Sequence, residues 1–246
     1  MDIVDLREFY SSSLGQAAQK LISQQLMARW PNIRDSRLLG LGYAIPYLDE
    51  LGRNASHNIA FLPARIGAVA WPENGPNRTA LVDEAQLPLA DGSIDYVLVI
   101  HGLEHTQEAS GLLSEVFRIL SPQGRALFIV PNRRGLWARF DSTPFGHGQP
   151  FSRGQLSGLL RDAQFSPLDW SNFLFMPPIN RNFCIRSANL IERLGLALGS
   201  GFSGLIMAEA VKQVYALTPD RKARRLMARF RPALQPAPAM RDAQNP

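Results

Sequence analysis

The run IDYVLVI at residues 94–100 constrains the fold more than any other part of the sequence. Five of its seven residues are β-branched or aromatic, which favours a β-strand. We therefore place this segment at the centre of a β-sheet.

Strand-like and helix-like patterns alternate along the rest of the chain. Strands are predicted at 37–42, 57–63, 79–82, 125–130, 166–176 and 204–217, and helices at 6–30, 46–52, 108–120, 152–162 and 187–198. Strands that alternate with helices indicate an α/β fold with a parallel, doubly wound sheet. The last two strands are expected to form a hairpin at the edge of that sheet.

Length and charge predict one domain followed by a basic tail. A chain of 246 residues, 46% of them apolar, can bury one sizeable core. Residues 1–217 hold 19 basic and 19 acidic side chains, so the whole net charge of +5 lies in 218–246. We expect a domain over 1–217, with residues 1–30 as an N-terminal capping helix. The tail reads as a basic amphipathic helix and then a proline-rich disordered end.

The same charge pattern narrows the choice of partners and location. The neutral body has no basic stripe with interleaved aromatic residues, which argues against nucleic acid. The basic stretch 221–231 suits an anionic membrane surface or an acidic protein. The polar N-terminus and the single cysteine, Cys184, indicate a cytoplasmic protein. The weakly polar run 194–208 is too short to span a bilayer and is expected in the core.

Gly40, Gly42 and Asp83 are the first candidates for a binding site. Glycines directly after a strand let a backbone approach a nucleotide closely, because they lack the Cβ atom that would collide with it. An ordinary strand-end turn explains such a pair equally well, and Ala44 stands where a third glycine would complete the motif. Asp83 follows the strand 79–82, at the edge where open α/β sheets bind ligands. Asp95 begins a strand at the opposite edge and is expected to be a turn residue.

The segment HGLEH at residues 101–105 leaves the carboxyl end of the central strand. Two histidines and a glutamate are metal-ligand types. Gly102 argues against a helix that would align His101 with His105, and the sequence offers no Cys or Asp cluster as a further ligand. We therefore expect no metal here, and Glu104 is interpreted as a cap of the next helix.

Two further candidates lie after the fifth strand. Asn132 follows that strand directly, and His147 lies in the glycine-rich loop 145–151. Loops at this edge of an α/β sheet often carry function. Arg133 and Arg134 are equally well explained as surface residues of a turn.

Three segments together carry a family resemblance: LLGLGY at 38–43, LPLADGSIDYVLVIHGLEH at 87–105 and LLSEVFRILSPQGRALFIVPN at 112–132. In these segments the chain resembles the class I S-adenosylmethionine-dependent methyltransferases, in particular their type 11 small-molecule branch. The resemblance implies a Rossmann-like sheet of seven strands in the order 3-2-1-4-5-7-6, with strand 7 antiparallel. It also implies S-adenosyl-L-methionine as the cofactor.

The resemblance assigns roles to the candidate residues. It implies that Gly40 and Gly42 lie under the methionine part of the cofactor and that Asp83 hydrogen-bonds the adenine amino group. His101 would lie beside the reactive methyl group. Such enzymes align an acceptor and, where needed, remove its proton, a task that His101 or His105 can perform.

The sequence departs from the family at two positions. The first motif normally opens with an acid, where this chain has Arg37-Leu38-Leu39. The second strand normally ends in an acid that holds both ribose hydroxyls, where this chain has 61–65, FLPAR; Glu73 lies too far along to replace it. Losing charge-assisted bonds of roughly 1.5–3 kcal/mol each weakens binding about a hundredfold or more.

These observations lead to one functional prediction and one alternative. The prediction is methyl transfer to a small, apolar or amphipathic acceptor, with Tyr10, Asn132 and His147 near that acceptor. The alternative is a non-catalytic relative that uses the same fold to bind or regulate a protein partner.

Overall fold

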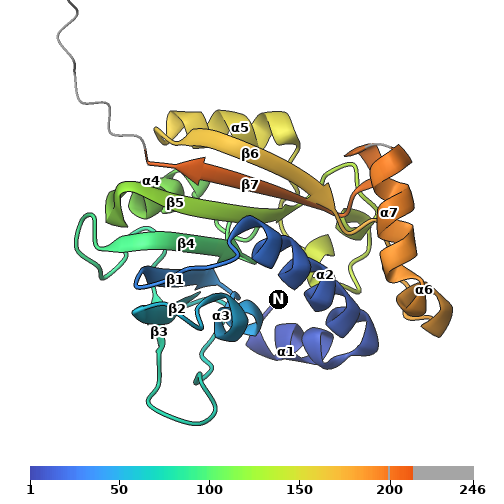
Figure 1. Cartoon of the computed structure of the whole chain (residues 1–246), viewed down its shortest axis with the longest axis horizontal. Helices are drawn as coiled ribbons and strands as arrows, with labels where there is room; N and C mark the ends of the chain where they lie inside the picture. Colours follow the sequence, from blue (N-terminus) through green and yellow to red (C-terminus); the bar gives the residue numbers. More distant parts are fainter. Residues whose placement is uncertain (199, 213–246) are drawn as a thin grey trace, which may run out of the picture. The chain divides into compact units, whose positions relative to one another are not determined.

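A computed structural model describes residues 1–198 and 200–212 of the chain (Figure 1). These residues fall within a compact unit that spans 1–213, where the sequence predicted a domain over 1–217. The predicted tail, including its basic stretch 221–231, lies outside the described residues.

Seven strands form one sheet in the order β3-β2-β1-β4-β5-β7-β6. Strands β1 to β5 pair in parallel, and β7 is antiparallel to both β5 and β6. This confirms the expected order and the antiparallel seventh strand. The strands are β1 (Arg37–Gly42), β2 (His57–Pro63), β3 (Thr79–Val82), β4 (Ile94–Ile100), β5 (Leu120–Pro131), β6 (Ser166–Phe173) and β7 (Leu205–Val211).

Helices cover both faces of the sheet, and successive residues of a strand pack against opposite faces. In β4, Leu98 and Ile100 pack in the apolar cluster of the N-terminal helices, whereas Val97 and Val99 pack in the opposite cluster with α4 and α5. The helices are α1 (Ile3–Ser11), α2 (Ser13–Arg29), α3 (Ile45–Leu51), α4 (Ala109–Ile119), α5 (Arg153–Asp162), α6 (Asn182–Arg186) and α7 (Ala188–Leu198), with short 3-10 turns at Trp137–Arg139, Pro144–Gly146 and Ser200–Phe202.

The N-terminal segment forms two helices, so the prediction of one helix over 6–30 was wrong at Ser12. The backbone of Ser12 is extended, with φ −73° and ψ 158°, and its Oγ accepts a hydrogen bond from the Gly15 amide at 3.0 Å. A Cβ atom on Gly15 would lie only 1.9 Å from the Phe9 carbonyl oxygen. Glycine therefore allows the sharp corner by which α1 turns away from α2.

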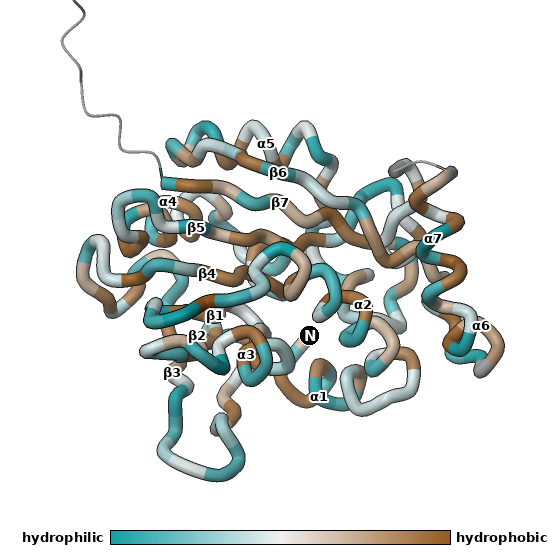
Figure 2. The backbone as a smooth tube through the Cα atoms, viewed as in Figure 1, coloured by the Kyte–Doolittle hydropathy of each residue, from teal (hydrophilic) through white to brown (hydrophobic). Residues whose placement is uncertain are grey.

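The run 194–208 divides into an exposed half and a buried half, which corrects its expected place in the core. Leu194 on α7 is 55% exposed and Phe202 is 71% exposed, whereas Leu205 to Ala208 on β7 are buried. Figure 2 shows the corresponding hydrophobic colouring along α7. None of the helices in the part of the chain that the structure describes is long and apolar enough to cross a membrane.

Candidate active site

The carboxyl ends of β1 and β4 bring the first candidates together. His101 directly follows β4, is fully buried and has a φ of 53°, in the left-handed region that non-glycine residues rarely occupy. Gly42, at the end of β1, pairs with Ile100 in the sheet and has a φ of 89°. The neighbouring carboxyl ends of these two parallel strands form the centre of the candidate site.

Gly40 and Gly42 leave space that the protein itself fills. A Cβ atom on Gly40 would lie 2.7 Å from the Cβ of Ala44, on the loop that begins α3. A Cβ atom on Gly42 would lie 2.2 Å from the Ile100 carbonyl oxygen. These glycines therefore allow close packing between β1, α3 and β4. Their place under the methionine part of the cofactor stays a prediction.

A chain of buried hydroxyl groups leads from α3 to His101. Tyr47 donates a hydrogen bond to the Tyr10 hydroxyl at 2.9 Å, and that hydroxyl lies 2.8 Å from Nε2 of His101. Burial raises the pKa of both Tyr10 and Tyr47, so both hydroxyls keep their protons at neutral pH. Helix α1 thus covers the end of β4 with Tyr10, a residue that the sequence analysis placed near the acceptor.

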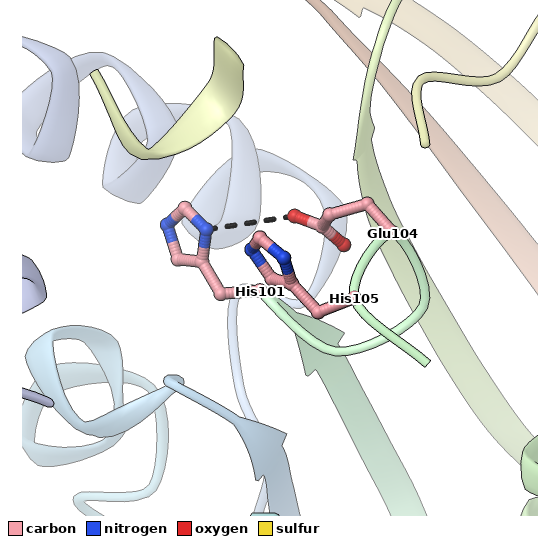
Figure 3. A group of neighbouring side chains, drawn as sticks. All are labelled: His101, Glu104 and His105. Atoms are coloured by element: carbon pink, nitrogen blue, oxygen red, sulfur yellow. Dashed lines mark ion pairs between the residues drawn. The ribbon is translucent and has the colours of Figure 1, made fainter. Parts of the chain in front are cut away.

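His101, Glu104 and His105 converge in the turn after β4 (Figure 3). Nδ1 of His101 lies 3.5 Å from a carboxylate oxygen of Glu104, and both side chains are almost completely buried. Among the described residues, neither Nδ1 of His101, nor either Glu104 carboxylate oxygen, nor Nε2 of His105 has a hydrogen-bond partner. Glu104 does not cap α4, in contrast to its sequence interpretation, because the N-cap of α4 is Glu108.

Burial and charge act in opposite directions within this cluster. Burial raises the pKa of Glu104, but its interaction with the His101 ring, with smaller contributions from His105 and from the Glu104 backbone, more than offsets this and holds the carboxyl pKa below its usual range. Burial lowers the pKa of His105, and the nearby Glu104 carboxylate opposes this shift only in part. The His105 ring is therefore neutral at pH 7.

Asp83 lines a cavity of about 420 Å³ at the ends of β2 and β3 and the start of α4. One of its carboxylate oxygens accepts the Ala85 amide at 2.9 Å, and the side chain is otherwise exposed. Glu84 lines the same cavity and forms an ion pair with Arg65 at 2.6 Å. Glu84 was not among the residues predicted from the sequence, and it brings a carboxylate next to Arg65, after the strand end where the family's ribose acid is missing.

Asn132 and His147 lie apart from the buried cluster. The Asn132 amide donates to the carbonyl and hydroxyl oxygens of Ser203, and its oxygen accepts the Arg134 amide, which leaves a substrate only one further lone pair. His147 is exposed and lines a cavity of about 570 Å³ together with Phe9. The Phe9 ring contacts Phe145, which packs on His101 with ring centroids 4.7 Å apart. Two aromatic rings thus separate that cavity from His101.

The fold and this arrangement define the class of protein. The sequence model of the methyltransferase domain family matches residues 16–169, more than half of the chain. The chain therefore belongs to the methyltransferase domain family. The cofactor of this family and of its relatives is S-adenosylmethionine.

The chain is also similar to individual proteins of known sequence or structure. A probable S-adenosylmethionine-dependent methyltransferase of Mycolicibacterium smegmatis is 36% identical over 87 residues, which cover 35% of this chain and 34% of that protein. The chain thus matches about a third of the length of this curated relative. An S-adenosylmethionine-dependent methyltransferase from Thermotoga maritima has a similar fold, with a TM-score of 0.61 at 16% identity over 84% of this chain and 94% of that one. The [4+2]-cyclase SpnF also shares the fold, with a TM-score of 0.53 at 19% identity over 81% and 82% of the two chains.

The residues at the strand ends fit a nucleoside cofactor in two respects. The cavity beside Asp83 and Glu84 lies outside the carboxyl ends of parallel strands, where open α/β sheets bind such groups. Buried polar atoms without a partner in the described chain, on His101 and Glu104, lie at the exit of β4, which is separated from β2 by β1 in the sheet. Tyr10 covers the site at His101, so a ligand that reaches His101 has to displace its hydroxyl.

Proposed function

We propose that this protein transfers the methyl group of S-adenosylmethionine to a small acceptor molecule. The observation that carries the proposal is the cavity beside Asp83 and Glu84, at the cofactor edge of a methyltransferase sheet and next to the buried His101 cluster. When bound, the cofactor supplies the electrophilic methyl group. The protein's own task is to hold the cofactor, align the acceptor and manage the acceptor's proton.

We assign roles to three residues of this cavity and to the two glycines of β1. Asp83 accepts a hydrogen bond from the adenine amino group, and Glu84, held by Arg65, takes the place of the ribose acid. Gly40 and Gly42 contribute by letting β1, α3 and β4 meet closely beneath the cofactor. Glu84 is already paired with Arg65 and therefore binds the ribose less well than an unpaired carboxylate would. We expect weaker cofactor binding than is usual for the family.

The acceptor's proton is assigned to the histidines after β4. His105 is neutral at pH 7, and its Nε2 has no hydrogen-bond partner within the described residues, so it can accept a proton. His101 is the second candidate, with its ring orientation fixed by Tyr10. Tyr10 itself would leave His101 when the site opens and would then contact the acceptor.

The charge around the outer cavity favours an acceptor with an amine or another cationic group over the apolar acceptor expected from the sequence. Three carboxylates, Asp5, Glu8 and Asp141, line this cavity together with His147. Opposite charge at a cavity mouth raises the local concentration of a cationic ligand. Asn132 then ties the end of β5 to Ser203, in the segment that precedes β7.

A labelled-methyl assay tests the proposal. Full-length protein is incubated with methyl-labelled S-adenosylmethionine and a small-molecule extract, and label in acceptor products is measured. We expect transfer by the parent protein, at least tenfold less by Asp83→Ala, and unchanged transfer by Glu73→Ala, a carboxylate outside the cavity.

The alternative, a non-catalytic protein that binds or regulates a partner, is supported by the Tyr10 cover and the substituted ribose acid. If the protein binds the cofactor but transfers no methyl label to any acceptor pool, that result would favour the alternative.

We also propose, from the basic stretch 221–231 of the sequence, that an anionic membrane surface or an acidic protein is a further partner of this protein, which we expect in the cytoplasm. Near an anionic bilayer each basic residue contributes about 1 kcal/mol, and salt screens this attraction. Sedimentation with anionic but not neutral vesicles at low salt, abolished by deletion after Thr218, is the expected result. Vesicle binding that survives the deletion would exclude the stretch as the contact.

A further inference from the structure

We propose that His101, Glu104 and His105 bind a divalent transition-metal ion, with zinc as the representative case. Metal binding by these three residues does not depend on the proposed methyl transfer, so either proposal can fail while the other holds. The proposal reverses the expectation from the sequence, in which Gly102 argued against an alignment of His101 with His105 and no metal was expected.

The donor set matches the chemistry of such an ion. Two imidazole nitrogens and one carboxylate oxygen form the three-ligand set found in several catalytic zinc sites and in non-haem iron sites. In this protein one ligand atom from each residue lies within 4.8 Å of the other two. A tetrahedral zinc ion holds its ligand atoms roughly 3.4 Å apart, given bond lengths of about 2.0–2.2 Å.

The burial of these residues distinguishes the cluster from a chance group of polar side chains. His101 is fully buried, and Glu104 is 1% exposed. Within residues 1–198 and 200–212, both Glu104 oxygens and Nδ1 of His101 have no hydrogen-bond partner. A buried carboxylate loses its water, and for Glu104 the neighbouring His101 ring, with Nδ1 at 3.5 Å, is the main group that compensates for this loss. One cation between the three side chains would satisfy these atoms together.

The surroundings already orient the ligands. The Tyr10 hydroxyl bonds Nε2 of His101, which turns Nδ1 toward Glu104. A partner on the second ring nitrogen is how proteins fix the orientation of metal-binding histidines. Gly148 packs against the ring of His105, since a Cβ atom there would lie 2.9 Å from its Nδ1. The turn and the loop around Gly148 therefore hold both rings near Glu104.

A bound ion would change the chemistry available at the site. A histidine nitrogen that coordinates a metal no longer accepts a proton, so His101 and His105 would not act as free bases. The ion would instead acidify a water or an acceptor oxygen bound at an open coordination position. Three protein ligands leave such a position on a tetrahedral ion.

Cobalt titration of the full-length protein tests the site directly. Protein treated with a chelator is titrated with Co²⁺, and its visible absorption bands report both stoichiometry and coordination. We expect saturation at one ion per chain and displacement of the bands by Zn²⁺. Glu104→Gln and His105→Gln should weaken binding by roughly tenfold or more. His57→Gln removes an exposed histidine far from the cluster in the sequence and should have no effect.

The result that overturns the proposal is the absence of stoichiometric binding, or binding that Glu104→Gln and His105→Gln leave unchanged. If either substitution prevents folding, X-ray absorption of the zinc-loaded parent protein decides instead. Two imidazoles and an oxygen in the coordination shell would support the site, and a shell without imidazole would exclude it. Neither measurement requires S-adenosylmethionine. The metal site can therefore be tested even if the protein does not bind the cofactor.

Discussion

At Gly42 the backbone requires glycine, whether or not a ligand is bound. Its φ of 89° is in the left-handed region, and a Cβ atom would lie 2.2 Å from the Ile100 carbonyl oxygen. Gly42→Ala should therefore lower the free energy of unfolding by about 2–4 kcal/mol, measured by urea denaturation.

Gly158 provides the matched control for this substitution. It lies within α5, and in the described part of the chain a Cβ atom there would have no heavy atom within 4 Å other than local backbone. Gly158→Ala should stabilise the protein by about 0.5–1 kcal/mol, because alanine favours a helix. Equal stability of Gly42→Ala and the parent would show that the turn tolerates a side chain.

Asp95 has a larger structural role than the turn residue that the sequence indicated. Its carboxylate accepts hydrogen bonds from the Arg37 side chain at 2.9 and 3.0 Å and from the Ser121 hydroxyl at 2.9 Å. The Arg37 guanidinium is the main reason that the pKa of Asp95 falls to about 2. The pair ties the start of β1 to the start of β4.

This lowered pKa predicts a pH dependence of stability. The Asp95 pKa is about 2 when folded and about 3.9 when unfolded, so its contribution is present above pH ~4 and is lost as the pH falls through 2. Since both side chains are partly exposed, solvent screening reduces the contribution to about 1 kcal/mol. Asp95→Asn should remove that stability at pH 7 and flatten the decline below pH 4 in urea titrations. An unchanged decline would assign it to other carboxylates.

Glu84 and Glu104 show why sequence reasoning found only part of the site. Asp83 and His101 were recognised because they directly follow predicted strands, and that position fixes the edge of the sheet on which they lie. Glu84 and Glu104 lie one and three residues further on. Their direction depends on the Arg65 ion pair and on an irregular turn, and neither has a repeating sequence pattern.

At the scale of the elements, the corner at Ser12 predicts a measurable cap energy. The Ser12 hydroxyl caps α2 through Gly15, so Ser12→Ala should cost about 0.5–2 kcal/mol in thermal or urea unfolding. Ser11 is the neighbouring control, because its hydroxyl donates only to the Arg7 carbonyl within α1. Ser11→Ala should change stability by less than about 0.5 kcal/mol. Equal effects of the two substitutions would argue against the cap.

The first four strands were predicted more accurately than the later ones: β5 begins at Leu120, five residues before its predicted start, and β6 ends at Phe173, three residues before its predicted end. Apolar runs bounded by turn residues predicted β1 to β4 with the limits that the structure has. The N-terminal apolar pattern continues through Ser12, so its periodicity could not reveal the break between α1 and α2. For 194–208, composition alone predicted burial, whereas the chain folds its first half into α7, with several leucines exposed.

At the scale of the whole molecule, alternating patterns were sufficient for a doubly wound sheet, but the strand order came from the family resemblance. No local pattern states that β7 lies between β5 and β6. A capping helix in the N-terminal segment, with Tyr10 near the acceptor, was expected from the sequence. The hydrogen bonds by which Tyr47 and Tyr10 reach His101 were not expected, because they depend on the corner at Ser12 and on tertiary contacts. This cover is the feature that most separates the protein from an open cofactor crevice.

The central claim is that the cavity beside Asp83 and Glu84 binds the family's cofactor. Calorimetric titration of the full-length protein with S-adenosylhomocysteine tests it most directly. We expect one S-adenosylhomocysteine molecule per chain, bound more weakly than is usual for this family. Asp83→Asn, which keeps the acceptor for the Ala85 amide, should weaken binding by about 1–3 kcal/mol, and Glu73→Gln should not. No heat and no thermal shift at millimolar ligand, or equal affinity of Asp83→Asn and the parent, would contradict the account.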